Sequence, residues 1–176
     1  MSSLRRLYFF CTAINRNVGR WVAWLTVAMV LVQFSVVMLR YLFGYGSIFM
    51  QESVFYMHAL LFILGAGYTL SQDGHVRVDI FYQSADEHYR AKVNLFGVFA
   101  FLLPFCFTLL YVTLPYASQS WAVLEGSKET SGIPAVYLLK SSIFLFCVFL
   151  ILQGLAVAAS SILTLKGQPI QKADHG

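Results

Sequence analysis

Charged residues are scarce in this chain of 176 residues: only 11% are Asp, Glu, Lys or Arg, whereas 59% are hydrophobic. Ordinary soluble domains carry about a quarter charged residues. The charges are also clustered, which leaves uncharged runs at 21–39, 53–72, 93–124 and 141–165. A helix needs about 20 apolar residues to cross the hydrocarbon core of a bilayer. The sequence therefore predicts four transmembrane helices and leaves no room for a large soluble domain.

The sequence also lacks the residue patterns of catalytic, metal-binding and disulfide-bonded proteins. The three cysteines, Cys11, Cys106 and Cys147, are scattered, which fits neither a disulfide framework nor a metal site, so we expect them to be small packing residues. The sequence has no Gly-rich phosphate loop, nucleophile constellation or Cys/His cluster, so it predicts no enzyme, no metal and no cofactor. The net charge of +4 comes mostly from basic residues that flank the hydrophobic runs, which argues against a nucleic-acid partner.

Basic residues are unevenly distributed between the two ends of these runs. One side carries Arg5, Arg6, Arg16, Arg20, Arg77, Arg90, Lys92, Lys166 and Lys172, and the other carries Arg40, Lys128 and Lys140. Because basic residues favour the cytoplasmic side of a membrane, both termini and the second connection are predicted to be cytoplasmic. The first run is too long for a signal peptide and ends without a small-x-small site, so we expect a retained anchor.

The predicted fold is an all-α membrane protein with four transmembrane helices and an N-terminal interfacial amphipathic helix. Transmembrane helices are expected at 21–39, 53–70, 93–121 and 141–165, and the interfacial helix at 4–18, where apolar residues recur at helical spacing. Ser84 and Glu87 form a capping box that starts a long helix continuing into the third span. Pro104 is the expected kink in that helix.

Several polar side chains fall inside or beside the predicted spans. Gln33 and Gln153 lie at nearly one depth, so they either share a buried seam or face unrelated partners. His58 lies two turns inside the second span, where it marks either a functional site or a hydrogen bond to a neighbouring helix. Arg40 and Glu52 close the first two spans, either as interface anchors or as an ion pair that ties the spans together or docks a partner.

The second span contains a group of small residues near its end and is followed by a polar patch. Gly65-Ala66-Gly67 offers a surface for close helix contact. His75, Arg77 and Asp79 then alternate with apolar residues, as in a short extended segment, although a helix would pair His75 with Asp79 instead. His75 and Asp79 suggest a metal or acid–base site, but two ligands without a third favour a polar anchor at the helix exit.

Two stretches of the chain resemble a known family. RYLFGYGSIFMQE, from Arg40 to Glu52, and GAGYTLSQDGHVRVD, from Gly65 to Asp79, are similar to the small membrane subunit of tripartite ATP-independent periplasmic (TRAP) transporters. That family shows Arg-Tyr-x-Phe-Gly, Trp-x-Glu-Glu, Leu-Gly-Ala and Gly-x-His-Val-x-Val-Asp at this spacing. Here Phe49 stands at the Trp position and Gln51 at the first Glu position, so only one acid of the pair is present.

The resemblance implies a multi-pass protein of the bacterial inner membrane. Its partners would be a much larger membrane subunit, which binds sodium and substrate, a periplasmic substrate-binding protein, and membrane lipid. Uptake of an organic acid would be driven by an ion gradient, and the small subunit would act as a scaffold. Arg40, Glu52, Gly65, His75 and Asp79 are then motif positions with structural or docking roles.

Two other functions stay open alongside the scaffold. A haem- or quinone-binding membrane anchor of a respiratory enzyme uses paired histidines from facing helices, whereas only His58 lies within a span here and His75 follows the same helix. A small self-contained carrier is the third possibility. No span carries the midplane charge, broken helix or internal repeat that is typical of a transport pathway, so the scaffold is favoured.

Overall fold

The computed structural model describes residues 3–75, 82 and 85–170. Within them the chain forms α1 (Ser3–Phe43), α2 (Ile48–Ser71), α3 (Glu87–Gly97), the π-helical segment η1 (Val98–Leu102), α4 (Leu103–Ala122) and α5 (Val136–Leu165). α3, η1 and α4 follow one another without a break. Four continuous helical rods result, each long and apolar enough to cross a membrane, which confirms the predicted all-α membrane fold.

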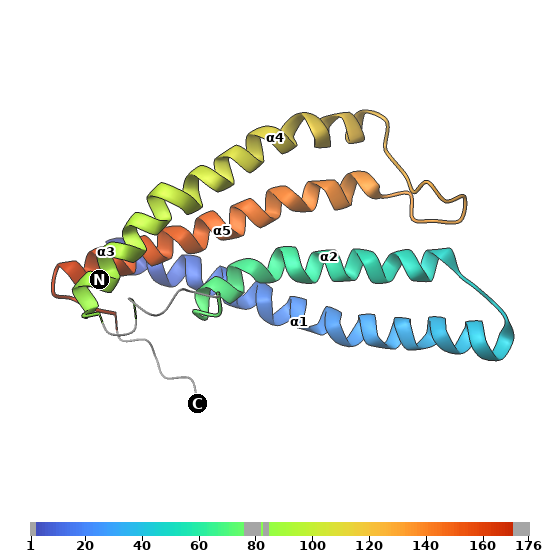
Figure 1. The fold of residues 1–176 in the computed structure, drawn as a ribbon, viewed down its shortest axis with the longest axis horizontal. Coiled ribbons are helices and arrows are strands. Elements are labelled where there is room, and N and C mark those ends of the chain that lie inside the picture. Colours follow the sequence, from blue (N-terminus) through green and yellow to red (C-terminus); the bar gives the residue numbers. More distant parts are fainter. Residues whose placement is uncertain (1–2, 76–81, 83–84, 171–176) are drawn as a thin grey trace.

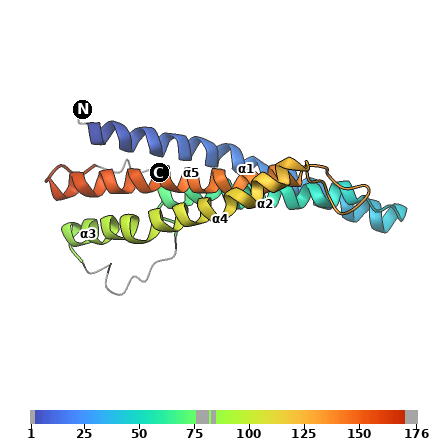
Figure 2. The same ribbon diagram turned by 90° about the horizontal axis from the view of Figure 1, so that it is seen from above.

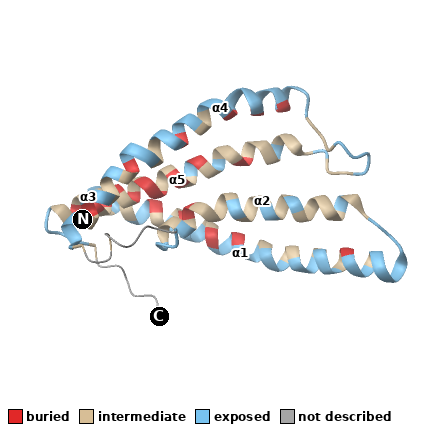
Figure 3. Cartoon of the chain, viewed as in Figure 1, coloured by how far each residue is buried: buried red, intermediate tan, exposed pale blue. Residues whose placement is uncertain are grey.

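The four rods form a twisted layer instead of surrounding a common axis. In the outer half their order across Figure 1 is α4, α5, α2 and α1. Beyond the end of α2, α1 packs directly against α5, and Figure 2 shows α1, α5 and α3 next to one another there. α5 packs against each of the other rods, whereas α4 packs against neither α1 nor α2 in the described part of the chain. Burial is therefore concentrated on α5, and the other rods expose much of their surface (Figure 3).

The two ends of this layer differ in their connections. The N-terminal end of α1 and the C-terminal end of α5 lie at one end, which we call the inner end (Figure 1). The loops 44–47 and 123–135 lie at the opposite end, which we call the outer end. α2 stops beside the middle of α5, since Gly67 in its last turns lies against Phe149. The first part of α1, α3 and the last part of α5 therefore extend inward beyond α2.

α1 differs from its prediction because it is one continuous helix of 41 residues, with no break between 4–18 and 21–39. At 1.5 Å per residue this is roughly 60 Å, about twice the thickness of a hydrocarbon core. Exposed Trp21 and Trp24 lie at one end of its apolar part and exposed Tyr41 at the other, and such rings favour the two membrane interfaces. The placement of residues 4–18 in the membrane interface stays a prediction.

The start of α3 also differs from its prediction. Asp86, and not Ser84, is the N-cap residue: its carboxylate accepts the Tyr89 N–H at 2.9 Å, and the helix begins at Glu87. Ser84 lies outside the described residues. Aspartate and serine cap helices equally well, so residue type alone did not separate the two positions.

A π turn, η1, lies just before Pro104, where the sequence predicted a kink, and the kink itself stays a prediction. The Leu103 N–H donates to the Val98 carbonyl, five residues back. Pro104 has no N–H to continue the regular ladder, and a π turn absorbs one extra residue without ending the helix. This turn shifts which side chains of α3 and α4 share a face.

Candidate functional site

Glu52 joins the outer end of α2 to the loop between α4 and α5. One oxygen of its carboxylate accepts from the Ser127 hydroxyl, and the other accepts the Ile133 N–H at 2.6 Å. Hydrogen bonds to a carboxylate are shorter and stronger than those between neutral groups. We call Glu52, Ser127, Gly132 and Ile133 the outer clasp.

The loop that Glu52 holds is itself folded by short-range contacts. The Ser127 N–H donates to the Ile133 carbonyl at 3.2 Å, and the Ser127 hydroxyl accepts the Glu129 N–H at 3.0 Å. A Cβ on Gly132 would lie 2.3 Å from the Ser127 hydroxyl oxygen and 2.6 Å from a Glu52 oxygen, so only glycine fits there. The loop is thus shaped to enclose one carboxylate.

A salt bridge beside the clasp ties the same loop to α5. The Lys140 ammonium donates to the Glu125 carboxylate and lies 4.0 Å from the centroid of the Tyr116 ring on α4. The Trp121 indole N–H donates to the Ser141 hydroxyl at 2.7 Å, which is a second link between α4 and α5. The hydrogen bond from Lys140 holds the pKa of Glu125 below its ordinary value.

Acidification is expected to release Glu125 from Lys140. Because the folded pKa of Glu125 lies below its ordinary value of 4.5, its contribution to stability is complete above about pH 4.5 and is lost as the pH falls through the folded pKa. The difference in Tm between the wild type and Glu125→Gln in detergent should be constant above that pH and shrink below it. Glu129→Gln on the same loop is the control, and a difference that persists unchanged to pH 2 would contradict the assignment.

A second polar junction lies where α1, α2 and α5 meet. The Asn15 side-chain amide donates to the Gln153 carbonyl oxygen at 3.3 Å and to the Cys11 carbonyl at 3.2 Å, and both polar side chains are buried. A Cβ on Gly67 would lie 2.1 Å from the Asn15 carboxamide oxygen, and one on Gly19 would lie 2.2 Å from the Tyr68 ring. We call Asn15, Gly19, Gly67, Tyr68 and Gln153 the inner junction.

The predicted seam between Gln33 and Gln153 is wrong, because Gln33 is exposed on α1 and Gln153 pairs with Asn15. The prediction that Gln33 and Gln153 lie at one depth assumed that the first membrane helix begins at Trp21. α1 instead begins at Ser3 and extends inward past Trp21. Sequence reasoning missed Asn15, although Cys11, Asn15 and Gly19 recur at the i, i+4 spacing of one helix face. That stripe was a signal that α1 packs against neighbours before Trp21.

The outer charges do not form the predicted ion pair. Arg40 is exposed, and no salt bridge joins it to Glu52 among the described residues. Glu52 instead ties α2 to the loop 123–135, so its expected structural role has a different partner. For Arg40 the other predicted role, an anchor at the membrane interface, stays a prediction.

The two histidines and Gly65 are not brought together by the fold. His58 is exposed, with its ring 4.7 Å from that of Phe62 on the same helix, so the expected bond to a neighbouring helix of this chain is not formed. A Cβ on Gly65 would meet nothing within 4 Å, and the expected close contact occurs at Gly67. His75 is exposed just beyond α2, where it does not face His58 from a second helix as a haem site requires.

The polar patch after α2 is only partly described. Arg77 and Asp79 lie outside the described residues, so the metal, acid–base and anchor alternatives for His75 and Asp79 stay predictions. Over 3–75, 82 and 85–170, no group of three or more His, Cys, Asp or Glu residues is placed to hold a metal ion. Cys11, Cys106 and Cys147 are all buried free thiols, which confirms their expected role in packing.

Comparison with known proteins connects this architecture to a family. No match was found among curated proteins or among solved structures. The family model of the DctQ component of tripartite ATP-independent periplasmic transporters matches residues 29–164, from the middle of α1 almost to the end of α5. The chain is therefore a member of the DctQ family, the small permease subunits of TRAP transporters, and a multi-pass protein of the inner membrane.

Proposed function

We propose that this subunit is a rigid plate that holds the large membrane subunit in place during uptake. The observation that supports this most strongly is the twisted layer of rods tied at both ends, by the outer clasp and by the inner junction. Each tie joins elements far apart in the sequence, and each would be lost if the rods moved separately. A layer also offers two broad faces to a partner, which a closed bundle of the same length would bury.

One stripe of α2 is suited to contact a transmembrane helix of the large subunit. Phe55, His58, Phe62 and Thr69 are exposed at helical spacing, and Gly65 on the same stripe has open space above it. Lipid tails offer no hydrogen-bond partner to an imidazole, so an intramembrane histidine normally faces protein or water. Small residues such as Gly65 and Thr69 let a second helix approach closely. Exposed Gln33 on α1 is a further polar group available to that partner.

Membership of the family supports a role in solute uptake. We propose that a periplasmic binding protein delivers an organic acid to the large subunit, and that a sodium gradient drives uptake. The excess of basic residues at the inner end favours a cytoplasmic location for that end and for both termini. The loop 123–135, held by Glu52, would then face the periplasm, where the binding protein arrives.

Substitutions in the α2 stripe are expected to weaken the complex without unfolding this subunit. His58→Leu removes one interhelical hydrogen bond, worth roughly 0.6–2 kcal/mol, so co-purification of the large subunit should fall about three- to thirtyfold. Gly65→Leu should have at least as large an effect because it fills the space that a second helix would occupy. The assay is recovery of the large subunit in mild detergent, followed by uptake in proteoliposomes.

Ala122→Leu, at the exposed outer end of α4, is the matched control and should recover the complex fully. Complete recovery with both α2 variants would contradict the docking stripe. Uptake by this chain alone in proteoliposomes, or a changed substrate preference in an intact complex, would contradict the scaffold function itself.

A further inference from the structure

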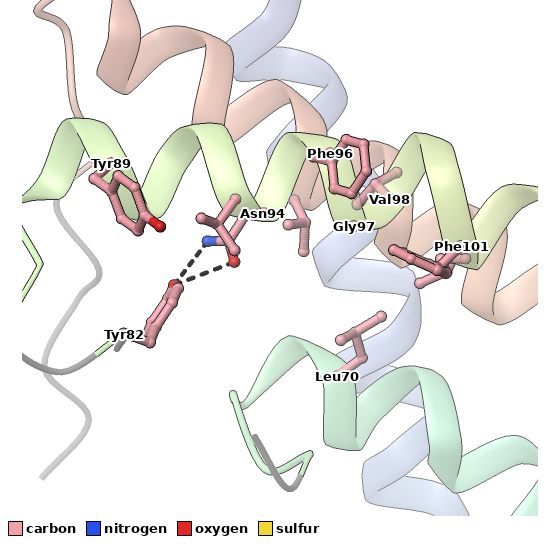
Figure 4. A pocket seen from close by; sticks show the side chains of 11 residues that line it. Leu70, Tyr82, Tyr89, Asn94, Phe96, Gly97, Val98 and Phe101 are labelled. Carbon is pink, nitrogen blue, oxygen red and sulfur yellow. Dashed lines mark hydrogen bonds between the residues drawn. The ribbon is translucent and has the colours of Figure 1, made fainter. Parts of the chain in front are cut away.

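An apolar cavity of about 640 Å³ lies between the end of α2 and the α3–η1 segment, and none of its lining residues belongs to the outer clasp, the inner junction or the α2 stripe. Leu70 of α2 and Val157 of α5 contribute to its lining together with side chains of α3 and η1. Figure 4 shows Leu70 below this space and Phe101 on the helix above it, and Phe96 and Val98 of that helix also line the cavity. The cavity exists because α2 stops beside the middle of α5 while α3 and η1 continue inward along it.

The π turn helps to shape the cavity wall. Phe96 and Phe101 are five residues apart and pack edge to face, with ring centroids 5.8 Å apart. In a regular α-helix, residues three or four apart share a face, whereas the π turn brings residues five apart closer to one face. Gly97 lies between Phe96 and Phe101 in the sequence. A Cβ on Gly97 would meet nothing within 4 Å, so the space beside the helix is open at this position.

Polarity changes from one end of the cavity to the other. At its inner rim the Tyr82 hydroxyl lies 2.9 Å from the Asn94 amide nitrogen (Figure 4). The guanidinium of Arg90 lies 5.5 Å from the centroid of the Tyr82 ring, and Lys92 is exposed on the same helix. Tyrosine and basic side chains favour the headgroup level of a membrane, and the phenylalanine, leucine and valine side chains favour the hydrocarbon below it.

We propose that this cavity binds an acyl chain of a phospholipid from the leaflet at the inner end, with the lipid phosphate beside Arg90. The gradient from a basic, tyrosine-containing rim to an apolar interior matches the gradient along a phospholipid. A transmembrane helix fits less well. With a diameter of 10–12 Å, a helix would fill the cavity with about one turn, which is too little for a helix interface. A flexible acyl chain adapts to the space without such a limit.

Native mass spectrometry of the full-length chain tests this site. After delipidation in mild detergent and incubation with vesicles of phosphatidylglycerol and phosphatidylethanolamine, the wild type should retain one phospholipid. Gly97→Leu should reduce that adduct at least about tenfold, because its side chain displaces the equivalent of two or more buried methylenes. Leucine also favours a helix more than glycine does, so this variant should fold, and circular dichroism would confirm it. Ala122→Leu is the control and should keep the lipid.

A photoreactive residue separates a lipid from a protein occupant. With p-benzoylphenylalanine in place of Phe96, irradiation of membranes that contain the whole transporter should attach a phospholipid to this chain. Attachment to the large subunit would overturn the proposal in favour of a protein contact. A wild type without a retained phospholipid, or an undiminished adduct in Gly97→Leu, would overturn it as well.

Discussion

Gly67→Leu is expected to prevent α1, α2 and α5 from meeting, and to lower stability more than any other single change in the inner half of the molecule. Even the first carbon of the new side chain would lie 2.1 Å from the Asn15 carboxamide oxygen and 3.0 Å from the Phe149 Cβ. Overpacking alone costs about 1–3 kcal/mol, and separation of the helices also leaves the Asn15 and Gln153 amides without each other. The expected loss therefore exceeds about 3 kcal/mol, measured as a fall in Tm in detergent.

Gly65→Leu is the matched control for this experiment on the isolated subunit. It places the same side chain on the same helix two residues away, where a Cβ meets nothing within 4 Å. Its Tm should stay close to that of the wild type. Equal losses of stability in the two variants would contradict the packing assigned to the inner junction.

Glu52→Ala is expected to open the outer clasp. The Ile133 N–H and the Ser127 hydroxyl would both lose their shared carboxylate acceptor. Hydrogen bonds to a carboxylate are stronger than those between neutral groups, so the loss of both should raise the opening equilibrium of the loop at least about tenfold. Hydrogen exchange at the Ile133 amide should therefore accelerate by about that factor.

Gln51→Ala, next to Glu52, is the control for the clasp and should leave exchange at Ile133 unchanged. Glu52→Gln should give an intermediate acceleration, because a neutral amide oxygen still accepts one of the two hydrogen bonds. An Ile133 amide that exchanges equally slowly in Glu52→Ala would show that the carboxylate does not hold the loop.

The number and type of the helices could be predicted because charge clustering marks the membrane spans directly. The arrangement of the helices could not be predicted, since apolar residues surround most of each rod and leave no single face that identifies the interior. The close approach at Gly67 instead of Gly65 depends on the rotation of α2 about its axis, and both glycines satisfy the same sequence pattern.

The outer clasp shows a different limit of sequence reasoning. Glu52 was recognised as a structural residue, but its charge suggested Arg40 as its partner. Its real partners are a hydroxyl and a backbone N–H in a loop far along the chain, and a backbone N–H is present at nearly every residue. Only the folded loop, with Gly132 leaving room for the carboxylate, distinguishes Ile133 from its neighbours.

The most direct test of a fixed plate is the distance between its two edges during transport. Val30 on α1 and Val112 on α4 are exposed, and the three native cysteines are buried, so cysteines introduced at these valines can be spin-labelled selectively. Double electron–electron resonance would be recorded on the complete transporter in proteoliposomes, with and without a sodium gradient and substrate-loaded binding protein. A rigid plate predicts one unchanged distance distribution, whereas a second or shifted distance during uptake would contradict it.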